Sequence, residues 1–404
     1  MTIDDPLSAA SRTNDEAALF NSPRARQFLK LPSGLRVAYA EVGDPTGVPV
    51  FMLTGLSGVR LYALFFAEVC LEAGVRLIAF DEPGVGLSGE LKDGDGVADA
   101  SAKVLFKDVV EITLAIADHL EIPRFGLLGF SLGTVSSLTL AKDHAARIIG
   151  PIQLFSPYLI PNSPGISSLV KVGAMLNASL IRSVVSAALG MGCDPHHSVW
   201  RRPIVSIITE MGGFTKALGA TSSACFPSSN KSDDEDEDDS SVEEEKTTRL
   251  PLIVAMNLRL EKLEAISYAL SRDPALTAAA AEEKVRKLCP KAAWRDTDVS
   301  AELNVESGFP RRPYAGQGMI RDLLIGLGKF GGPAYKPEDV LAPCHIWHGT
   351  ADGLVPLAAV RTLAKALPHA TLTEVRKGSH VLIRNRKVAI LAFGEIVDAY
   401  RVGQ

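Results

Sequence analysis

Short apolar segments alternate with helical patterns in two separate parts of this chain, and this alternation restricts the fold more than any other feature. The segments expected to form strands are 27–31, 35–42, 49–53, 75–80, 125–130, 148–155, 344–349 and 371–375. Helical patterns fill most of the intervals, at 59–73, 101–120, 132–142, 357–367 and in a final segment that ends at Tyr400. Near-continuous apolar runs such as 75–80 are typical of strands buried on both faces. The sequence therefore predicts an α/β fold with a mostly parallel, doubly wound sheet of about eight strands.

A long segment, 159–338, interrupts the alternation after the sixth predicted strand. It is comparable in length to a whole domain. Helical segments are expected within it at 166–189, 204–218, 250–271, 274–288 and 318–327. We therefore predict a mainly helical insertion in a core formed by 26–158 and 339–404.

Two other segments have compositions that do not suit packing. Residues 1–25 are expected to form a flexible polar arm. Inside the insertion, 221–248 is rich in serine and contains the acidic runs 233–239 and 243–245. Like charges repel one another and bury no apolar surface, so we predict that this segment is disordered. A calcium or basic-partner site is the alternative, although the run lacks the glycine and the spaced ligands of a calcium loop.

Bulk composition limits the kinds of partner. A formal net charge of -5 disfavours nucleic acid or anionic lipid as the main partner, and a hydrophobic small molecule fits better. No apolar run reaches about 18 residues and the acidic N-terminal segment does not resemble a secretory signal, so stable membrane insertion is not expected. Five scattered cysteines without a CxxC pair suit reduced thiols and a cytoplasmic location. The oligomeric state stays open.

A serine lies in the turn Gly129–Gly133, directly after a buried strand and at the start of a helix. The two glycines leave room for strand and helix to approach each other around Ser131. The free N–H groups of the helix N-terminus favour a developing negative charge there. This context predicts a nucleophilic serine, and an ordinary N-cap serine is the alternative.

A base and an acid that orients it should follow at later strand ends on the same edge of the sheet. Asp352 follows the predicted strand 344–349, and His380 follows the strand 371–375. Taken singly, Asp352 could cap a helix and His380 could be an incidental loop histidine. Together with Ser131, in this order, they predict a nucleophile, an orienting acid and a general base.

An oxyanion formed at Ser131 needs two backbone N–H donors. The first is expected at Leu132, the residue after the serine, and the second at Leu56, in the loop Thr54–Gly58 after the third strand. The alternative is that the glycines of this loop serve only a tight turn.

Four motifs, in this order, resemble those of the α/β-hydrolase fold superfamily, in its large serine-nucleophile group of esterases, lactonases, C–C bond hydrolases and aminopeptidases. They are Thr54–Gly58, Asp81–Ser88, Gly129–Gly133, and His348–Pro356 with Gly378–His380. The resemblance covers about 26–158 and 339–404. It implies that Ser131, Asp352 and His380 form a catalytic triad and that the insertion is a cap over the pocket.

Two positions depart from the patterns of that family. The first motif usually begins with His-Gly, and here it begins with Thr54-Gly55. The second usually has arginine after its aspartate, and here Glu82 follows Asp81. The first change alters the support of the oxyanion loop, and the second reverses a charge near the entrance.

Other polar residues are weaker candidates. Cys193, His196 and His197 are too few for a zinc site and are expected to lie in a loop, so we predict no metal and no cofactor. His119 and His144 fall near helix ends, where a positive charge is commonplace. Asp322 could reach the pocket from a cap helix, but an exposed helix face is the default expectation.

We therefore expect a serine hydrolase that cleaves a hydrophobic carboxylic ester, thioester or lactone. The cap, with segments such as 168–181, should line an apolar pocket beside Ser131. Acyl transfer, C–C bond cleavage or cofactor-free perhydrolysis could use the same triad. A ligand-binding protein that has lost turnover is the alternative outside enzymes.

Overall fold

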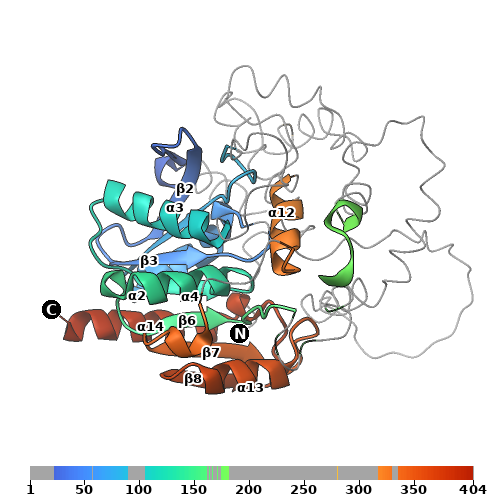
Figure 1. The fold of residues 1–404 in the computed structure, drawn as a ribbon. Helices are drawn as coiled ribbons and strands as arrows, with labels where there is room; N and C mark the ends of the chain where they lie inside the picture. The colour runs from blue at the N-terminus through green and yellow to red at the C-terminus, as the bar shows by residue number, and fades with distance from the viewer. Residues whose placement is uncertain are drawn as a thin grey trace, which may run out of the picture.

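A single sheet lies at the centre of the structure, a computed structural model that describes residues 22–56, 58–89, 105–161, 163, 166, 171, 174–181, 280, 317–329 and 335–403 (Figure 1). Eight strands build this sheet in the order β1-β2-β4-β3-β5-β6-β7-β8. Their bounds are β1 Gln27–Lys30, β2 Arg36–Gly43, β3 Val48–Leu53, β4 Val75–Phe80, β5 Gly126–Phe130, β6 Ile152–Phe155, β7 Cys344–Gly349 and β8 Ala370–Val375. The predicted number of strands is confirmed.

Strand direction determines where the loops meet. Strand β2 is antiparallel to both of its neighbours, β1 and β4, and every other adjacent pair is parallel. The predicted mostly parallel sheet is confirmed. The carboxyl ends of β3 to β8 therefore lie along one edge, where ligands of open α/β sheets usually bind.

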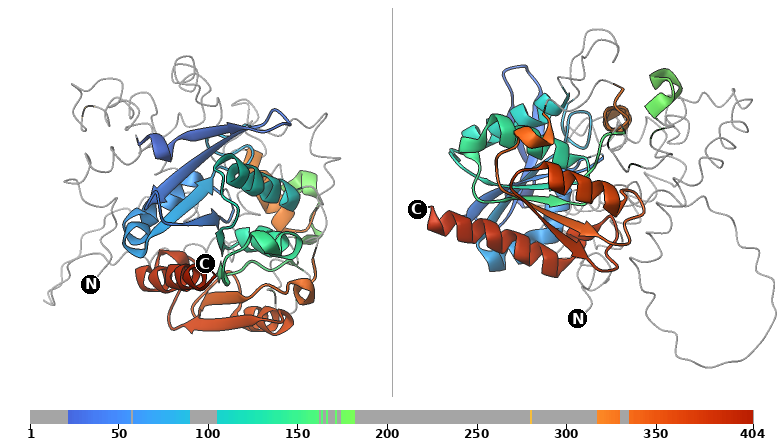
Figure 2. Two further views of the ribbon diagram at one scale, coloured as in Figure 1. Left: turned by 90° about the vertical axis from the view of Figure 1, so that its left-hand side faces the viewer. Right: turned by 60° about the horizontal axis from the view of Figure 1, so that its bottom comes forward.

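Helices cover both faces of the sheet (Figures 1 and 2). Helices α2 (Ala67–Ala73) and α14 (Arg386–Val402) pack on one face. Helices α3 (Leu105–His119), α4 (Gly133–Asp143) and α13 (Leu357–Ala366) pack on the other. Because each face has its own apolar cluster, the central strands are buried on both sides, which explains their near-continuous apolar sequences.

Most element boundaries agree with the predictions to within a few residues, and two elements differ. Strand β6 begins at Ile152 rather than 148, because Gly150 has φ +64° and Pro151 has no N–H to donate. The predicted helix 59–73 is divided into a 3₁₀ helix, Arg60–Phe66, and α2.

Residues 22–25 also differ from the prediction of a flexible arm. Pro23–Ala25 form a short 3₁₀ helix, and Ala25 is buried in the core. The carbonyl of Ala25 accepts a hydrogen bond from Nε of Arg60 at 3.1 Å, which ties this segment to the 3₁₀ helix Arg60–Phe66. Residues 1–21 lie outside the described part of the chain.

The segment between β6 and β7 is described only in part. Helix α12 (Gln317–Gly326) corresponds to the helix predicted at 318–327. The helix predicted at 166–189 is wrong at Leu176 and Asn177, which are not helical, because the Asn177 side chain accepts from the N–H of Ser179 and begins a new helical turn. The predicted helices 204–218 and 250–271, nearly all of 274–288, and the acidic segment 221–248 lie outside the described residues.

Candidate active site

Ser131 occupies a strained turn between β5 and α4. Its φ is +52°, in the left-handed region that non-glycine residues seldom adopt and that costs about 1–3 kcal/mol. The N–H of Ser131 donates to the carbonyl of Phe155 at 3.0 Å. The carbonyl of Ser131 accepts from the hydroxyl of Thr134 at 2.6 Å and from two backbone N–H groups, those of Thr134 and Tyr158, each at 3.1 Å. These four bonds hold the strained conformation in place.

The glycines on either side of the turn are required by close contacts. A Cβ at Gly129 would lie 3.0 Å from Cα of Thr134 and would overlap the Ser137 hydroxyl. A Cβ at Gly133 would lie 2.5 Å from the carbonyl carbon of Leu53, at the end of β3. Helix α4 therefore approaches two strand ends more closely than any side chain permits, as the sequence predicted for this turn.

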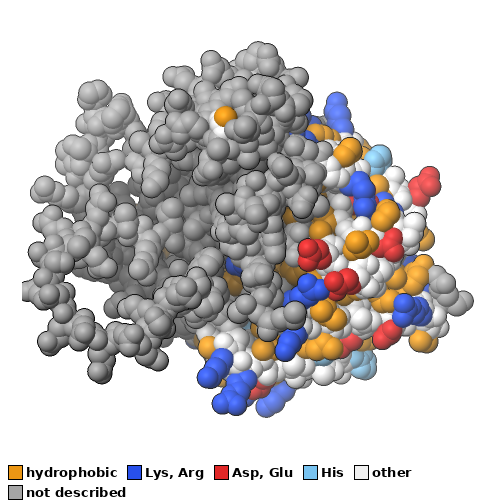
Figure 3. Space-filling model, turned by 180° about the vertical axis from the view of Figure 1, so that it is seen from behind, with side chains coloured by type: hydrophobic (Ala, Val, Ile, Leu, Met, Phe, Trp, Pro, Cys, Tyr) orange, Lys and Arg blue, Asp and Glu red, His pale blue; other side chains and the backbone are white. Residues whose placement is uncertain are grey.

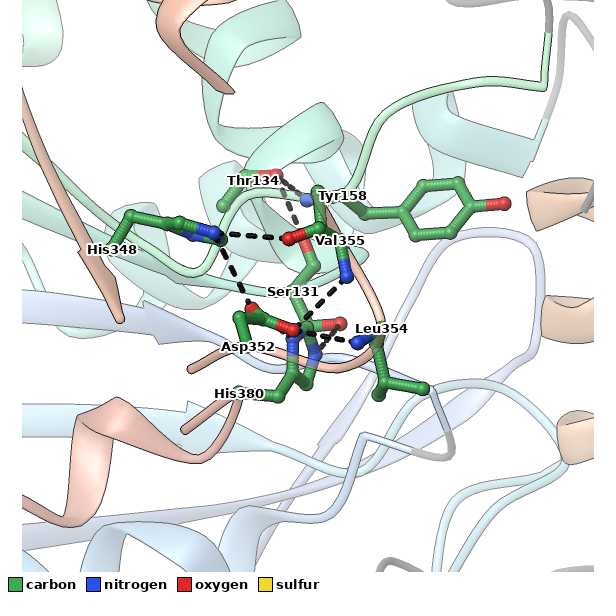
Figure 4. Close-up of polar contacts among 8 residues, drawn as sticks. All are labelled: Ser131, Thr134, Tyr158, His348, Asp352, Leu354, Val355 and His380. Carbon is green, nitrogen blue, oxygen red and sulfur yellow. Dashed lines mark hydrogen bonds and ion pairs between the residues drawn. The ribbon is translucent and has the colours of Figure 1, made fainter. Parts of the chain in front are cut away.

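The structure brings together the three residues predicted to form the triad (Figure 4). Oγ of Ser131 lies 3.0 Å from Nε2 of His380, and Nδ1 of His380 lies 2.9 Å from Oδ2 of Asp352. Ser131 is 7% exposed and His380 is 2% exposed. The three side chains come from the carboxyl ends of β5, β7 and β8, so the sheet edge brings them into one hydrogen-bonded chain.

Asp352 is held as a carboxylate by its surroundings. Burial by itself would raise the pKa of this carboxyl group, but the charge and hydrogen bond of His380, with weaker help from Val355 and His348, lower the pKa below its ordinary value. Oδ1 accepts from the backbone N–H groups of Leu354 and Val355 at 2.8 and 3.0 Å. The N-cap of α13 is Pro356, so Asp352 does not cap that helix, just as Leu132 rather than Ser131 is the N-cap of α4.

His348 is a neighbour of the site that the sequence analysis did not single out. Its Nε2 donates to the carbonyl of Val355 at 3.1 Å and lies 3.7 Å from Oδ2 of Asp352, with both side chains fully buried. Burial lowers the pKa of His348, against the opposing charge of Asp352. The sequence did contain a signal for His348, because this residue lies in the same motif as Asp352. It is near the end of β7, four residues before the acid.

The two predicted oxyanion donors flank Ser131. Leu132 follows it in the chain, and the loop that carries Leu56 presses against it, because a Cβ at Gly55 would lie 2.9 Å from Cβ of Ser131. Among the described residues, no backbone carbonyl accepts from the N–H of Leu56 or Leu132. Within the described part of the chain, both N–H groups are therefore available to a ligand oxygen.

A buried ion pair shapes the loop that follows β4. The backbone N–H of Arg60 donates to Oδ1 of Asp81 at 2.7 Å, and its guanidinium donates to Oδ2 at 2.6 Å, with both side chains fully buried. The same Oδ2 accepts from the N–H of Leu87 at 2.8 Å. Asp81 therefore joins the segment after β3 to the glycine-rich turn Asp81–Ser88.

Helix α12 lies against the start of α4. The Tyr158 hydroxyl donates to the carbonyl of Gly326 at 2.6 Å, and Ile325 packs against Val135. A cavity of about 20 Å³, enough for roughly one water molecule, remains between α12 and Leu132. Asp322 lines this cavity and is 4% exposed, so the default expectation of an exposed helix face is wrong.

The remaining candidates are two histidines at helix ends and a group outside the described part of the chain. His119 is the last residue of α3 and His144 follows α4, as predicted. Cys193, His196 and His197 lie outside the described residues. Within the described ranges, no cluster of three or more histidine, cysteine or acidic side chains could hold a metal ion, and no helix is long and apolar enough to cross a membrane.

Comparison with known proteins identifies the fold. A family model described as the alpha/beta hydrolase fold matches residues 48–186, which include β3 to β6 and the Ser131 turn. The chain has the α/β-hydrolase fold. The crystal structure of a membrane phospholipase A, a bacterial virulence factor, has the same fold, with a TM-score of 0.52 at 15% identity over 97% of this chain and 91% of that one.

Two relatives of this α/β-hydrolase chain are more similar in sequence over shorter lengths. The "Putative carbamate hydrolase RutD" of Variovorax paradoxus is 33% identical over 150 residues, 37% of this chain. The "Putative non-heme haloperoxidase" of Mycobacterium phage D29 is 32% identical over 129 residues, 32% of this chain. The chain spans about half the length of these relatives, 53% and 42% respectively.

Proposed function

We propose that the protein is a serine hydrolase that cleaves a hydrophobic carboxylic ester, thioester or lactone through an acyl-enzyme on Ser131. The observation that carries this proposal is the chain of hydrogen bonds from Ser131 through His380 to Asp352, at 3.0 and 2.9 Å. A serine hydroxyl becomes a nucleophile when a base within hydrogen-bond reach takes its proton and an acid orients that base.

The first half of the reaction forms the acyl-enzyme. The Oγ of Ser131 adds to the substrate carbonyl carbon while Nε2 of His380 takes the hydroxyl proton. The negative oxygen of the tetrahedral intermediate accepts from the N–H groups of Leu56 and Leu132. His380 then gives its proton to the departing alcohol or thiol, and the acyl group stays on Ser131.

The second half releases the acid. Water adds to the acyl carbonyl as His380 takes one of its protons, and the Ser131 oxygen leaves with that proton. Asp352 stays ionised throughout and stabilises the imidazolium of His380. Acyl transfer uses another acceptor in place of water, and C–C cleavage uses a carbon leaving group, so both remain variants of this scheme.

A fluorophosphonate probe tests the nucleophile directly. We expect stoichiometric labelling of the protein and complete loss of the label in Ser131→Ala. Ser156→Ala is a matched control, because Ser156 is also buried with positive φ, +44°, at the end of the adjacent strand β6. Absence of the label would indicate a ligand-binding protein without turnover, and a label that survives Ser131→Ala would show that Ser131 is not the nucleophile.

Aryl esters and lactones of increasing acyl length then test the substrate class. We expect kcat/KM to rise with chain length, because an apolar pocket contributes about 0.8 kcal/mol for each buried CH₂. Turnover restricted to short acyl chains would reject the hydrophobic substrate class but leave the role of Ser131 intact.

A further inference from the structure

The two positions that depart from the usual family motifs, Thr54 and Glu82, meet at one glycine. A Cβ placed on Gly58 would lie 2.5 Å from Oε1 of Glu82 and would overlap the hydroxyl of Thr54. Gly58 is the last residue of the loop that carries Leu56. Both departures therefore act on the same loop, although they are 28 positions apart in the sequence.

Glu82 contacts this loop through its backbone as well. Its N–H donates to the carbonyl of Gly58 at 3.0 Å, and the side chain turns back against the Cα of the same residue. Thr54, at the start of the loop, is 3% exposed. Glu82 thus holds the end of the loop that the Thr54 side chain supports at its start.

The carboxyl group of Glu82 also reaches the insertion. Glu82 and Asp322 of α12 line the same cavity of about 20 Å³ beside Leu132 and Gly133, and a hydrogen bond between their carboxyl groups is among the causes that raise the pKa of Glu82. An ionised carboxylate can only accept hydrogen bonds. A hydrogen bond between these two groups therefore requires one proton between them.

The charges around the pair agree with a retained proton. Burial raises the pKa of Glu82 well above its usual range, and the negative charge of Asp322 raises it further, while Arg321 opposes both. The guanidinium of Arg321 is engaged by Asp108 of α3 at 2.8 Å, which reduces its ability to neutralise Glu82. These are the charged groups of α12 and α3 that bear on the pair among the described residues.

We propose that Glu82 and Asp322 are positioning residues that share one proton and so tie α12 to the oxyanion loop Thr54–Gly58. This inference rests on the proposed function, because the loop matters to catalysis only if the N–H of Leu56 binds an oxyanion. Loss of the proton leaves two like charges at hydrogen-bond distance, which repel each other. The loop then loses its support from α12, and the Leu56 N–H moves away from the reacting oxygen.

The test compares wild type with Glu82→Gln, Asp322→Asn and Glu82→Ala. An amide keeps one hydrogen bond to the remaining carboxylate at every pH, so the first two variants imitate the protonated pair. Asp398→Asn is the control, because Asp398 is an exposed carboxyl on α14, far from the loop in sequence. Each variant is assayed for kcat, KM and melting temperature from neutral to alkaline pH.

In wild type and in Asp398→Asn, we expect kcat to fall as the pair loses its proton, with KM little changed. Glu82→Gln and Asp322→Asn should keep their kcat over the same range. Glu82→Ala should lower kcat by about tenfold to a hundredfold at all pH values, since small misplacement of a catalytic group has effects of this size. Parallel pH profiles in wild type, Glu82→Gln and Asp322→Asn would overturn the inference.

Melting separates this inference from the proposed function. The folded pair keeps a proton that the unfolded chain releases, so its contribution to stability is present at low pH and is lost as the pH rises through the raised pKa of Glu82. Glu82→Gln should not show this loss of stability as the pH rises. If the melting result holds but wild type shows no Ser131-dependent turnover, the proposed function and the positioning role both fail. If wild type shows Ser131-dependent turnover, but Glu82→Gln and Asp322→Asn change neither the pH profile of kcat nor that of the melting temperature, only this inference fails.

Discussion

Nδ1 of His380 lies 2.9 Å from Oδ2 of Asp352, and the exposed fractions of the two side chains are 3% and 0%. An ionised acceptor on this side requires the proton of the neutral imidazole to be on Nδ1. Nε2 is then free to accept the Ser131 proton. The acid therefore selects the tautomer that makes the base usable.

Asp352→Asn should abolish this selection with little change in shape. The amide can donate to Nδ1, which stabilises the tautomer with its proton on Nε2, and the Ser131 hydroxyl then loses its acceptor. In serine hydrolases with this arrangement the comparable change lowers kcat by roughly 10⁴-fold. Steady-state hydrolysis of an aryl ester measures this decrease in kcat, and the melting temperature shows whether the variant is folded. A kcat within tenfold of wild type would show that Asp352 has no role in the mechanism.

His348 should make the protein sensitive to mild acid. Because burial lowers the pKa of His348 in the folded state, the unfolded chain binds a proton first as the pH falls below about 6.5. The stability that depends on neutral His348 is thus present above that pH and is lost as the pH falls towards the folded pKa. Glu374 and His380 act on His348 as well, in opposite directions.

His348→Gln tests this expectation, because glutamine can still donate to the carbonyl of Val355 but does not titrate. The variant should show a shallower decrease in melting temperature between neutral and mildly acidic pH. His119→Gln, at the end of α3, is a control whose profile should follow wild type. A His348→Gln profile parallel to wild type would mean that His348 does not determine acid stability.

The buried pair Arg60–Asp81 should matter to stability chiefly when only one partner is removed. Asp81→Ala takes the Asp81 carboxylate away from a guanidinium that has no exposed surface, and breaking a buried pair in this way usually costs about 3–5 kcal/mol. The double variant Arg60→Met/Asp81→Leu removes both charges and should be less destabilised. Urea unfolding gives both free energies, and a double variant less stable than Asp81→Ala would show that the pair stabilises the fold in its own right.

The sequence predicted the parts of this protein that depend on local pattern and chain order. The alternation of apolar and helical segments predicted the mostly parallel sheet. The position of Ser131 between a strand and a helix predicted the turn that carries the serine. Asp352 and His380 were predictable because strand ends of a parallel sheet share an edge. Predicting these three residues requires no knowledge of side-chain packing.

Other features depend on tertiary contacts that no single segment encodes. The burial of Asp322 comes from the packing of α12 against α4, and the role of His348 comes from the fold of its own loop around Asp352. Helical periodicity alone predicts an exposed position for Asp322, and the packing of α12 against α4 explains why this residue is 4% exposed. The start of β6 was missed because Gly150 and Pro151 interrupt an apolar run without changing its hydrophobicity.

Gly133→Ala tests how closely α4 must approach the end of β3. The added methyl group would overlap the carbonyl oxygens of Leu53 and Thr54, which are backbone atoms that cannot rotate away. Overpacking of this kind typically costs about 1–3 kcal/mol. The displaced Thr54 would also move the oxyanion loop, so the rate of fluorophosphonate labelling at Ser131 should fall together with stability.

Gly394→Ala is the matched control for this substitution. Gly394 lies within α14, and a Cβ there has no neighbour within 4 Å. Alanine in place of glycine inside a helix gains up to about 1 kcal/mol, so this variant should melt at or above the wild-type temperature and label at the wild-type rate. If Gly133→Ala behaves in the same way, the close approach of α4 to β3 does not hold the oxyanion loop in position.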